Sequence, residues 1–393
     1  MNQFSFKKKF FFVIFFFLIF ILIIEISLRL LHIEYPIFQK HDKIRGFSLL
    51  PNSSGTWSRE GEGKVSINSV GLRDFEHSIN KPLNNFRIVI LGDSFAEARS
   101  VDIDKTFWFK LKNDLKFCKK LHFEKNIEII NFGITEYGTT QQYLTLQNIW
   151  KYDPDIILLA FFSGNDIADN YKSLSQKKYR PYFQFNKKNE VEVDDSFLNS
   201  KPYKILSSFP GRIFIRVSQY SRIAQLFREA YVQSYFKNQA QKNQTQVKEN
   251  FKKIKKNSSN LYNPINSNWS KAWDITEKIL LMINKEVKNK DKDFILVSLS
   301  NPIQVNPQKQ IVSQYKEKNN IEDIFYPENR LKDLAMKNSI KYVPLAKKMS
   351  AIASEEEIYF HGFTNTILGE GHWNESGHEY ASKLISRDIC NLY

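Results

Sequence analysis

The chain has 393 residues, of which 42% are hydrophobic and 25% are charged, an ordinary composition for a globular protein with a sizeable core. Its formal net charge of +15 is unusual, but the lysines are scattered and accompany no nucleic-acid-binding motif, so we expect no nucleic-acid partner. A basic exterior suits anionic lipid headgroups or acidic polysaccharide, although a composition rich in Lys, Asn, Ile and Phe is the simpler explanation. Cys118 and Cys390 form no CxxC pair, so no metal or redox site is expected; two unpaired thiols are the default, and one disulfide is the alternative.

The chain opens with an apolar run. As a helix, Phe10–Leu31 is about 33 Å long, close to the thickness of one hydrocarbon core. Three lysines, at positions 7–9, precede the run, and by the positive-inside bias this end stays in the cytoplasm while the rest of the chain is exported. No small-x-small cleavage site follows, which favours an uncleaved anchor over the competing interpretation, a cleaved signal peptide. Glu25 and Arg29 lie four residues apart near the far end, so they share one face of the helix and can pair.

After this anchor the sequence falls into two further parts. Residues 33–85 are mixed polar and glycine-containing, and we interpret them as a stalk or N-terminal extension with short strands. Residues 86–393 alternate short apolar runs with helical patterns, interrupted by a large insertion at 170–268. The runs that predict strands are Phe86–Leu91, Ile127–Asn131, Asp155–Phe162, Asp293–Leu299 and Ile340–Leu345. Helical periodicity separates them, which is typical of a five-stranded parallel sheet covered on both faces, with right-handed crossovers.

Chemistry-bearing residues follow these strands at the carboxyl edge of the sheet, where ligands bind in open α/β folds. A serine comes after the first strand, an amide after the third, and an acid and a histidine after the fifth. The four segments are Gly92-Asp93-Ser94, Asn131 to Gly138, Ser163 to Asp166, and Glu370-Gly371-His372.

This order of segments resembles the SGNH (GDSL-like) serine hydrolase family. Gly92-Asp93-Ser94 matches the first block, and the resemblance implies that Ser94 is the nucleophile. Asn131-x-Gly133 matches the second block, Gly164-Asn165-Asp166 the third, and His372-x-Asn-x-x-Gly-His the last. The resemblance covers residues 86–169 and 270–391. It implies a flavodoxin-like three-layer sandwich, His372 as the base, and Asn165 as a side-chain donor to the oxyanion hole.

The backbone N–H of Ser94 and one from the second block complete the implied oxyanion hole. This sequence departs from the family pattern at two places. The acid, usually Asp, is here expected to be Glu370, two residues before His372. The second-block glycine that donates its N–H is replaced by Glu136, with Gly138 two residues on, so Glu136 and Gly138 remain alternatives.

These residues predict an extracytoplasmic, membrane-anchored esterase that forms an acyl-serine intermediate, because a serine hydroxyl becomes nucleophilic when a neighbouring histidine takes its proton. The expected substrate is an acylated glycan or lipid, with O-acetyl esters foremost, and no cofactor or metal is expected. One alternative is a polysaccharide O-acyltransferase that uses the same triad. Another is a catalytically inactive glycan-binding protein. Tyr179, Tyr182 and Phe183 in the insertion are candidates for stacking on sugars, or they simply pack the insertion onto the sheet.

Overall fold

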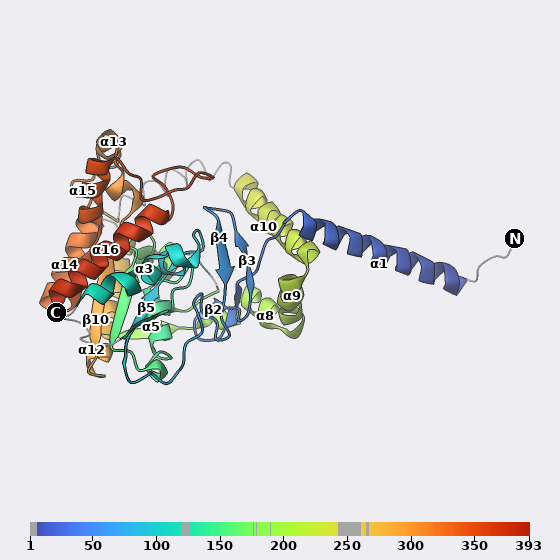
Figure 1. Cartoon of the computed structure of the whole chain (residues 1–393), viewed down its shortest axis with the longest axis horizontal. Coiled ribbons are helices and arrows are strands. Elements are labelled where there is room, and N and C mark those ends of the chain that lie inside the picture. Colours follow the sequence, from blue (N-terminus) through green and yellow to red (C-terminus); the bar gives the residue numbers. More distant parts are fainter. Residues whose placement is uncertain are drawn as a thin grey trace.

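The computed structural model describes residues 6–118, 126–175, 177, 179–188, 190–242, 261–264 and 267–393. At its centre is a five-stranded parallel sheet with the order β11-β10-β7-β5-β6 (Figure 1). The strands are β5 (Asn85–Gly92), β6 (Asn126–Asn131), β7 (Ile156–Phe161), β10 (Asp293–Ser298) and β11 (Lys341–Pro344). The first strand of this sheet lies between the second and the third, which is the flavodoxin-like order, so the predicted fold class is confirmed.

Helices cover both faces of the sheet because side chains alternate in direction along each strand. In β5, Val89 and Leu91 face one helical layer while Ile88 and Ile90 face the other, and all four are completely buried. The first layer consists of α5 (Thr139–Leu146), α12 (Ser267–Lys288) and α14 (Tyr326–Lys337), and the second of α3 (Phe107–Asp114), α15 (Ala346–Glu356) and α16 (Glu375–Leu392). Shorter elements join them: α2 (Ser94–Glu97), α6 (Asp166–Asn170), α7 (Lys172–Ser175), α13 (Lys309–Asn319), η1 (Ile103–Lys105), η2 (Leu115–Phe117), η3 (Trp150–Tyr152), η4 (Ser196–Asn199) and η5 (Pro302–Val305).

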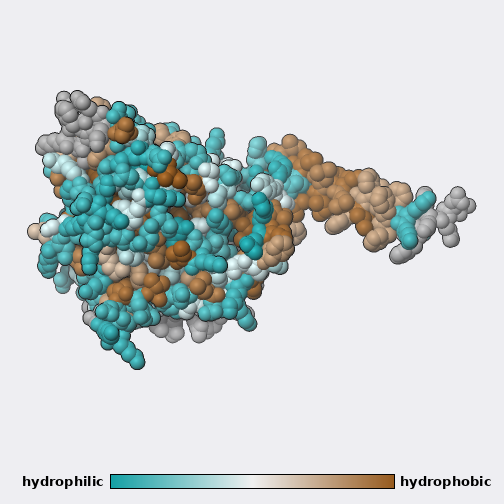
Figure 2. All heavy atoms as spheres, turned by 90° about the horizontal axis from the view of Figure 1, so that it is seen from below, coloured by the Kyte–Doolittle hydropathy of each residue, from teal (hydrophilic) through white to brown (hydrophobic). Residues whose placement is uncertain are grey.

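The N-terminal helix α1 (Phe6–Leu30) projects from the body as one apolar rod (Figures 1 and 2). Its stretch Lys7–Leu30 has a mean hydropathy of 3.1 over its most apolar window, and only 6% of that window is buried. An apolar helix of this length with so little of its surface buried fits a membrane span or a signal sequence. Glu25 and Arg29 form an ion pair of 2.8 Å near its end.

Residues 33–85, predicted as a stalk, form two antiparallel hairpins that pack onto the main sheet's loops. In the first, β1 (Gln39–Asp42) pairs with β2 (Gly46–Leu49), and in the second, β3 (Ser54–Trp57) pairs with β4 (Gly63–Ser66). Their buried apolar side chains form a small core with two residues from the loop after β6; its members are Phe38, Phe47, Leu49, Val65, Ile67, Ile134 and Tyr137. The hairpins therefore lie at the carboxyl edge of the sheet, where the predicted chemistry is.

Arg73 fixes this segment to the helix that follows β5. Its buried guanidinium donates to the carbonyl oxygens of Glu97 (2.6 Å), Ala98 (2.5 Å) and Val101 (2.6 Å). The next residue, Asp74, accepts a hydrogen bond of 2.7 Å from the backbone N–H of Asn131 at the end of β6. Carbonyl oxygens around both terminal nitrogens of the guanidinium offset much of the cost of burying this cation. Together, Arg73 and Asp74 tie the segment to two adjacent strand ends.

The predicted insertion adds a hairpin and a group of helices, and its residues 243–260 lie outside the described residues. The strands β8 (Tyr182–Phe185) and β9 (Val191–Asp194) pair, and α8 (Lys201–Ser207), α9 (Phe209–Tyr220) and α10 (Arg222–Lys242) follow beside the base of α1 (Figure 1).

Cys118 and Cys390 are joined in a disulfide, with their Cα atoms 5.5 Å apart. Unpaired thiols were the default expectation; the packing of α3 against α16 brings the two cysteines together instead.

Candidate active site

Ser94 is placed by a tight turn between β5 and α2. Asp93 caps the helix, and its carboxylate accepts the N–H of Phe95 at 2.9 Å. A Cβ atom at Gly92 would lie 2.7 Å from the Cβ of Ala96, so glycine allows the strand to pass close beside the helix that it leads into. The half-buried Ser94 therefore stands at the carboxyl end of β5, on the carboxyl edge of the sheet.

His372 reaches that hydroxyl from the loop before α16. Its Nε2 atom lies 2.7 Å from Ser94 Oγ. The imidazole packs beside the ring of Phe95, with the ring centroids 5.0 Å apart. Buried His361 supports the same loop, because its Nδ1 is bonded to the carbonyl oxygen of Gly371 at 2.7 Å. Two side chains that are 278 residues apart in the chain are thus within hydrogen-bonding distance, as a nucleophile and its base must be.

The carboxylate behind His372 is that of Glu60, and the prediction of Glu370 for this position needs correction. Glu60 Oε2 lies 2.5 Å from His372 Nδ1, and Glu60 Oε1 accepts the backbone N–H of His372 at 2.6 Å. Glu370 is exposed, and among the described residues its side chain forms no hydrogen bond or ion pair with His372, which bonds to Glu60 and Ser94 instead. Glu370 and His372 are separated by Gly371, which has a φ of +76°. In this loop the imidazole of His372 points toward Glu60 in the β3–β4 hairpin.

Sequence reasoning missed Glu60 because it placed the whole segment 33–85 in a stalk. Glu60 lies at the tip of the β3–β4 hairpin, in the sequence Arg59-Glu60-Gly61-Glu62-Gly63. An acid beside a glycine at a hairpin tip is a weak signal that could have been noticed. It would still have left Glu60 and Glu62 as equal candidates, since only the fold shows which of them meets His372.

Asn365 holds the Glu60 loop by hydrogen bonds, and Gly371 leaves room for the Glu60 carboxylate. Asn365 accepts the N–H of Gly61 at 2.9 Å and donates to the carbonyl oxygens of Ser58 (3.2 Å) and Gly61 (3.0 Å). A Cβ atom at Gly371 would lie 2.0 Å from Glu60 Oε1, and the φ of +76° at this position also disfavours any side chain. Glycine at 371 is therefore a requirement of the contact between the carboxylate and the imidazole.

The variant Gly371→Ala is expected to lower kcat/KM by about 100-fold, because the added methyl displaces the Glu60 carboxylate from His372. Steady-state kinetics on p-nitrophenyl acetate will measure the loss. Gly369→Ala is the matched control: its φ is also positive, at +83°, but its nearest neighbours are Asn306 and Tyr359. Equal losses in the two variants would attribute the effect to backbone strain alone and contradict this explanation.

The electrostatics of the three residues fit a general base with its supporting acid. Burial lowers the pKa of His372, but the hydrogen bond and the negative charge of Glu60 outweigh burial, and the net pKa is raised. Burial likewise raises the pKa of the Glu60 carboxyl, yet its bonds to His372 hold that pKa below its ordinary value. Glu60 therefore stays ionised near pH 7, fixes the Nδ1–H tautomer and stabilises the imidazolium as it forms.

This raised pKa predicts the acid limb of the pH profile. A base works only when it is neutral, so kcat/KM should fall as the pH drops through a midpoint above 6.5, the ordinary value for histidine. In Glu60→Gln the stabilising charge is absent, so the midpoint of the residual activity should move to lower pH. A pH series on both proteins is the measurement. An unchanged midpoint in the variant would show that Glu60 does not set the protonation of His372.

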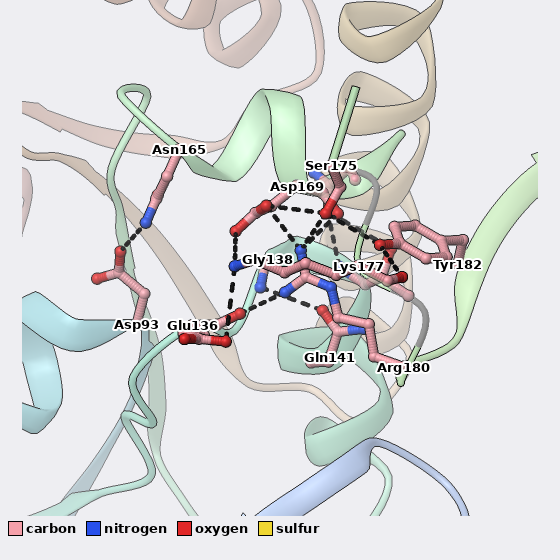
Figure 3. A network of polar contacts seen from close by, with 12 residues as sticks. Asp93, Glu136, Gly138, Gln141, Asn165, Asp169, Ser175, Lys177, Arg180 and Tyr182 are labelled. Atoms are coloured by element: carbon pink, nitrogen blue, oxygen red, sulfur yellow. Dashed lines mark hydrogen bonds and ion pairs between the residues drawn. The ribbon is translucent and has the colours of Figure 1, made fainter. Parts of the chain in front are cut away.

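Asn165 lies beside the nucleophile turn, where it was predicted. It precedes α6, and its Nδ2 atom donates to Asp93 Oδ2 at 3.0 Å, as Figure 3 shows. Only the NH₂ end of an amide can donate to a carboxylate, so this bond fixes the orientation of the side chain and leaves the second N–H for another acceptor. Burial raises the pKa of Asp93 to about 6, even though the Phe95 N–H and the Asn165 amide stabilise its charge.

Glu136 and Gly138 are the two alternatives for the second-block N–H donor to the oxyanion hole. The N–H of Gly138 is already hydrogen-bonded, whereas that of Glu136 is available. The Gly138 N–H donates to Gln141 Oε1 at 3.1 Å, whereas the Glu136 N–H has no acceptor among the described residues. Glu136 has a φ of +71°, which explains why the family pattern has a glycine here. Its carboxylate accepts the Tyr179 hydroxyl at 2.5 Å. The N–H of Thr135, one residue earlier, is held at 2.5 Å by Glu97 on the helix that begins with Ser94.

Buried Arg180 connects the second block to α6, the helix that follows the third block (Figure 3). Its guanidinium donates to the carbonyl oxygen of Glu136 and pairs with Asp169 Oδ1 at 2.7 Å. Of the aromatic residues proposed for sugar stacking, Tyr182 and Phe183 are buried against the body. The start of the insertion thus supports the loops around the site, and packing explains these two rings.

No family model matches the chain, and no curated protein matches it. Solved structures similar to it include the acetyl xylan esterase AlAXEase, with 12% identity, a TM-score of 0.38 and coverage of 76% of this chain and 98% of that one. A catalytic mutant of Axe2, an acetylxylan esterase from Geobacillus stearothermophilus, has 12% identity, a TM-score of 0.36 and coverage of 77% and 94%. LAE5, an alpha/beta hydrolase enzyme from the metagenome of Lake Arreo, Spain, has 10% identity, a TM-score of 0.38 and coverage of 78% and 96%. Function is therefore inferred from the site's own geometry.

Proposed function

We propose that this chain is a membrane-anchored, extracytoplasmic serine esterase of the SGNH type, which hydrolyses acyl esters, O-acetyl esters foremost, on a glycan or lipid. One observation carries the proposal: Ser94 Oγ, His372 Nε2 and Nδ1, and the Glu60 carboxylate form a continuous chain of contacts of 2.7 and 2.5 Å. A nucleophile, its base and the orienting acid of a serine hydrolase stand in this relation whatever the fold.

The chemistry follows from these contacts. Ser94 Oγ bonds to the acyl carbon while its proton moves to His372 Nε2, and the carbonyl oxygen becomes an oxyanion. The Ser94 N–H has no acceptor among the described residues, and with the Asn165 amide and the Glu136 N–H it would stabilise this charge. The ester C–O bond then breaks, and the leaving alcohol takes the proton from His372. Water repeats the sequence on the acyl-serine, which releases the carboxylic acid and restores Ser94.

Three features support export and anchoring of the domain. α1 has an unbroken apolar run from Phe10 to Ile24, and the three lysines before it, at positions 7–9, suit a cytoplasmic N-terminus. The disulfide between Cys118 and Cys390 fits an oxidising compartment outside the cytoplasm.

The inactive binding-protein alternative drew on the two departures from the family pattern. With Glu60 behind His372 and the Glu136 carboxylate bonded to Tyr179, neither departure opposes catalysis. The acyltransferase alternative shares every step up to the acyl-serine and differs only in the acceptor.

A fluorophosphonate probe tests the proposal, because it modifies only an activated serine. Wild type should be labelled and Ser94→Ala should not. Absence of label on the folded wild-type protein would overturn the esterase proposal. Acetylated glycans and lipids then serve as substrates: acetate released into water is expected, whereas acetyl moved onto an added glycan hydroxyl would assign the transferase function instead.

A further inference from the structure

Helix α9 carries an exposed apolar stripe with no protein partner among the described residues. Phe209, Ile213, Val217 and Tyr220 recur at helical spacing, and between 47% and 70% of the surface of each is exposed. The opposite face, which includes Gly211 and Ser218, is buried against the body. A helix with one buried small-residue face and one exposed apolar face is unfavourable in water, so something apolar is expected to cover the stripe.

Cations flank this stripe and line a groove beside it. At about 100° per residue, Arg212 and Arg216 lie immediately along one edge of the stripe. Together with Lys40 and Lys43 from the first hairpin they line a groove of about 580 Å³ between that hairpin and α8–α9. None of the four forms an ion pair with a described residue, and no carboxylate lines the groove. Four unpaired cations in one concave site call for an anionic ligand.

The position of α9 relative to α1 identifies what covers it. Arg29, on the last turn of α1, donates through its Nη2 atom to the carbonyl oxygen of Tyr220, the last residue of α9. Glu25 accepts the backbone N–H groups of Arg222 (2.9 Å) and Ile223 (3.1 Å) at the start of α10. These bonds fix the α9–α10 junction to the exit end of α1, where Figure 2 shows apolar surface continuing from the rod onto the body.

The depth of this junction follows from the length of α1. Arg29 lies twenty positions after Lys9, and a helix rises about 30 Å over that distance, one hydrocarbon thickness. Lysines at one interface therefore place Arg29, and with it Tyr220, at the other. An amphipathic helix at this level, with arginines beside its apolar stripe, has the pattern of a helix that lies in the membrane interface.

We infer that the groove between the first hairpin and α8–α9 binds the headgroups of anionic phospholipids, with the α9 stripe lying among their acyl chains. The inference rests on the proposed membrane anchoring and goes beyond it. A single spanning helix, even one bonded to the domain at its exit end, would still let the domain tilt relative to the membrane surface. A second contact with lipid fixes the distance and orientation of Ser94 relative to the membrane, and so restricts which envelope esters can reach it.

The depth of α9 is tested in the full chain, reconstituted into vesicles of phosphatidylcholine and phosphatidylglycerol. Single cysteines at Val217, at Ile14 in α1, and at Ile311 on α13, which lies at the opposite end of the body, are labelled with the fluorophore NBD in a Cys118→Ser/Cys390→Ser background. Fluorophosphonate labelling of Ser94 verifies that each variant is folded. Phospholipids carrying a doxyl quencher should reduce the emission at 217 and at 14 by about half and leave that at 311 unchanged.

Quenching at 14 without quenching at 217 would overturn the inference and leave the anchor intact. Quenching at neither position would overturn the anchor and the inference together. Headgroup selection is tested by native mass spectrometry of the lipids that the full chain retains. Arg212→Ala/Arg216→Ala should lower the ratio of phosphatidylglycerol to phosphatidylcholine roughly 25-fold, since each cation near the surface contributes about fivefold. Lys316→Ala/Lys318→Ala on α13 removes the same charge and should leave the ratio unchanged; equal ratios in all three proteins would overturn the headgroup assignment.

Discussion

The variant Glu60→Gln is expected to lose about 10⁴-fold in kcat, while Glu370→Gln keeps wild-type activity. Glu60 accepts two N–H groups of His372, one from the backbone and one from Nδ1. A glutamine that keeps its oxygen on the backbone N–H turns its NH₂ toward Nδ1. The imidazole must then carry its proton on Nε2, where it can no longer take the proton of Ser94. Steady-state kinetics with p-nitrophenyl acetate will give both values.

The two substitutions make the same chemical change, one at a carboxylate 2.5 Å from His372 and the other two residues before it in the sequence, so each is a control for the other. Circular dichroism and thermal unfolding establish that both variants are folded. A large loss in Glu370→Gln together with near-normal activity in Glu60→Gln would reverse the assignment of the acid. Similar modest losses in both would mean that the imidazole is oriented by its packing against Phe95 alone.

The second large effect is expected for Asn165→Ala, which should lower kcat by about 10² to 10³. The Asn165 amide is held by Asp93, the residue before the nucleophile, and its second N–H is free for the oxyanion. That charge exists only in the transition state and the tetrahedral intermediate. Loss of the Asn165 amide should therefore reduce kcat and kcat/KM together while KM stays unchanged.

Fluorophosphonate labelling separates this role from a structural one. Asn165→Ala should still be labelled, more slowly, because Ser94, His372 and Glu60 remain in contact. A rise in KM at constant kcat would instead make Asn165 a residue that binds the ground state. Complete loss of labelling together with a lower unfolding temperature would assign it to holding the nucleophile turn through Asp93.

The location of Glu60 affects how the protein can be divided. The hairpin that carries it lies in the segment between α1 and the sheet, and Arg73 in the same segment holds the backbone after Ser94. A chain cut before residue 86, the predicted start of the main domain, would lose both the acid and this support. Any soluble form used for a substrate screen should therefore begin near residue 33.

The sequence by itself determined the sheet, its strand order through the resemblance, and the meeting of Ser94 with His372. Those features depend on local information: apolar runs of strand length, and short blocks that each follow a strand end. Parallel strands bring their carboxyl ends to one edge, so residues placed there by local pattern are brought together wherever they lie in the chain. The same logic located Asn165, and the resemblance to the SGNH family limited the second-block donor to Glu136 or Gly138.

Only the tertiary structure decided which carboxylate stands behind the histidine, because Glu60 and His372 are 312 residues apart and Glu60 follows no strand of the main sheet. Sequence proximity favoured Glu370, yet the positive φ at Gly371 turns the imidazole away from its neighbour and toward a separate hairpin. The pairing of Cys118 with Cys390 and the docking of α9 beside α1 are of the same kind. Contacts between distant surfaces depend on how whole elements pack, and no local pattern of residue types records that packing.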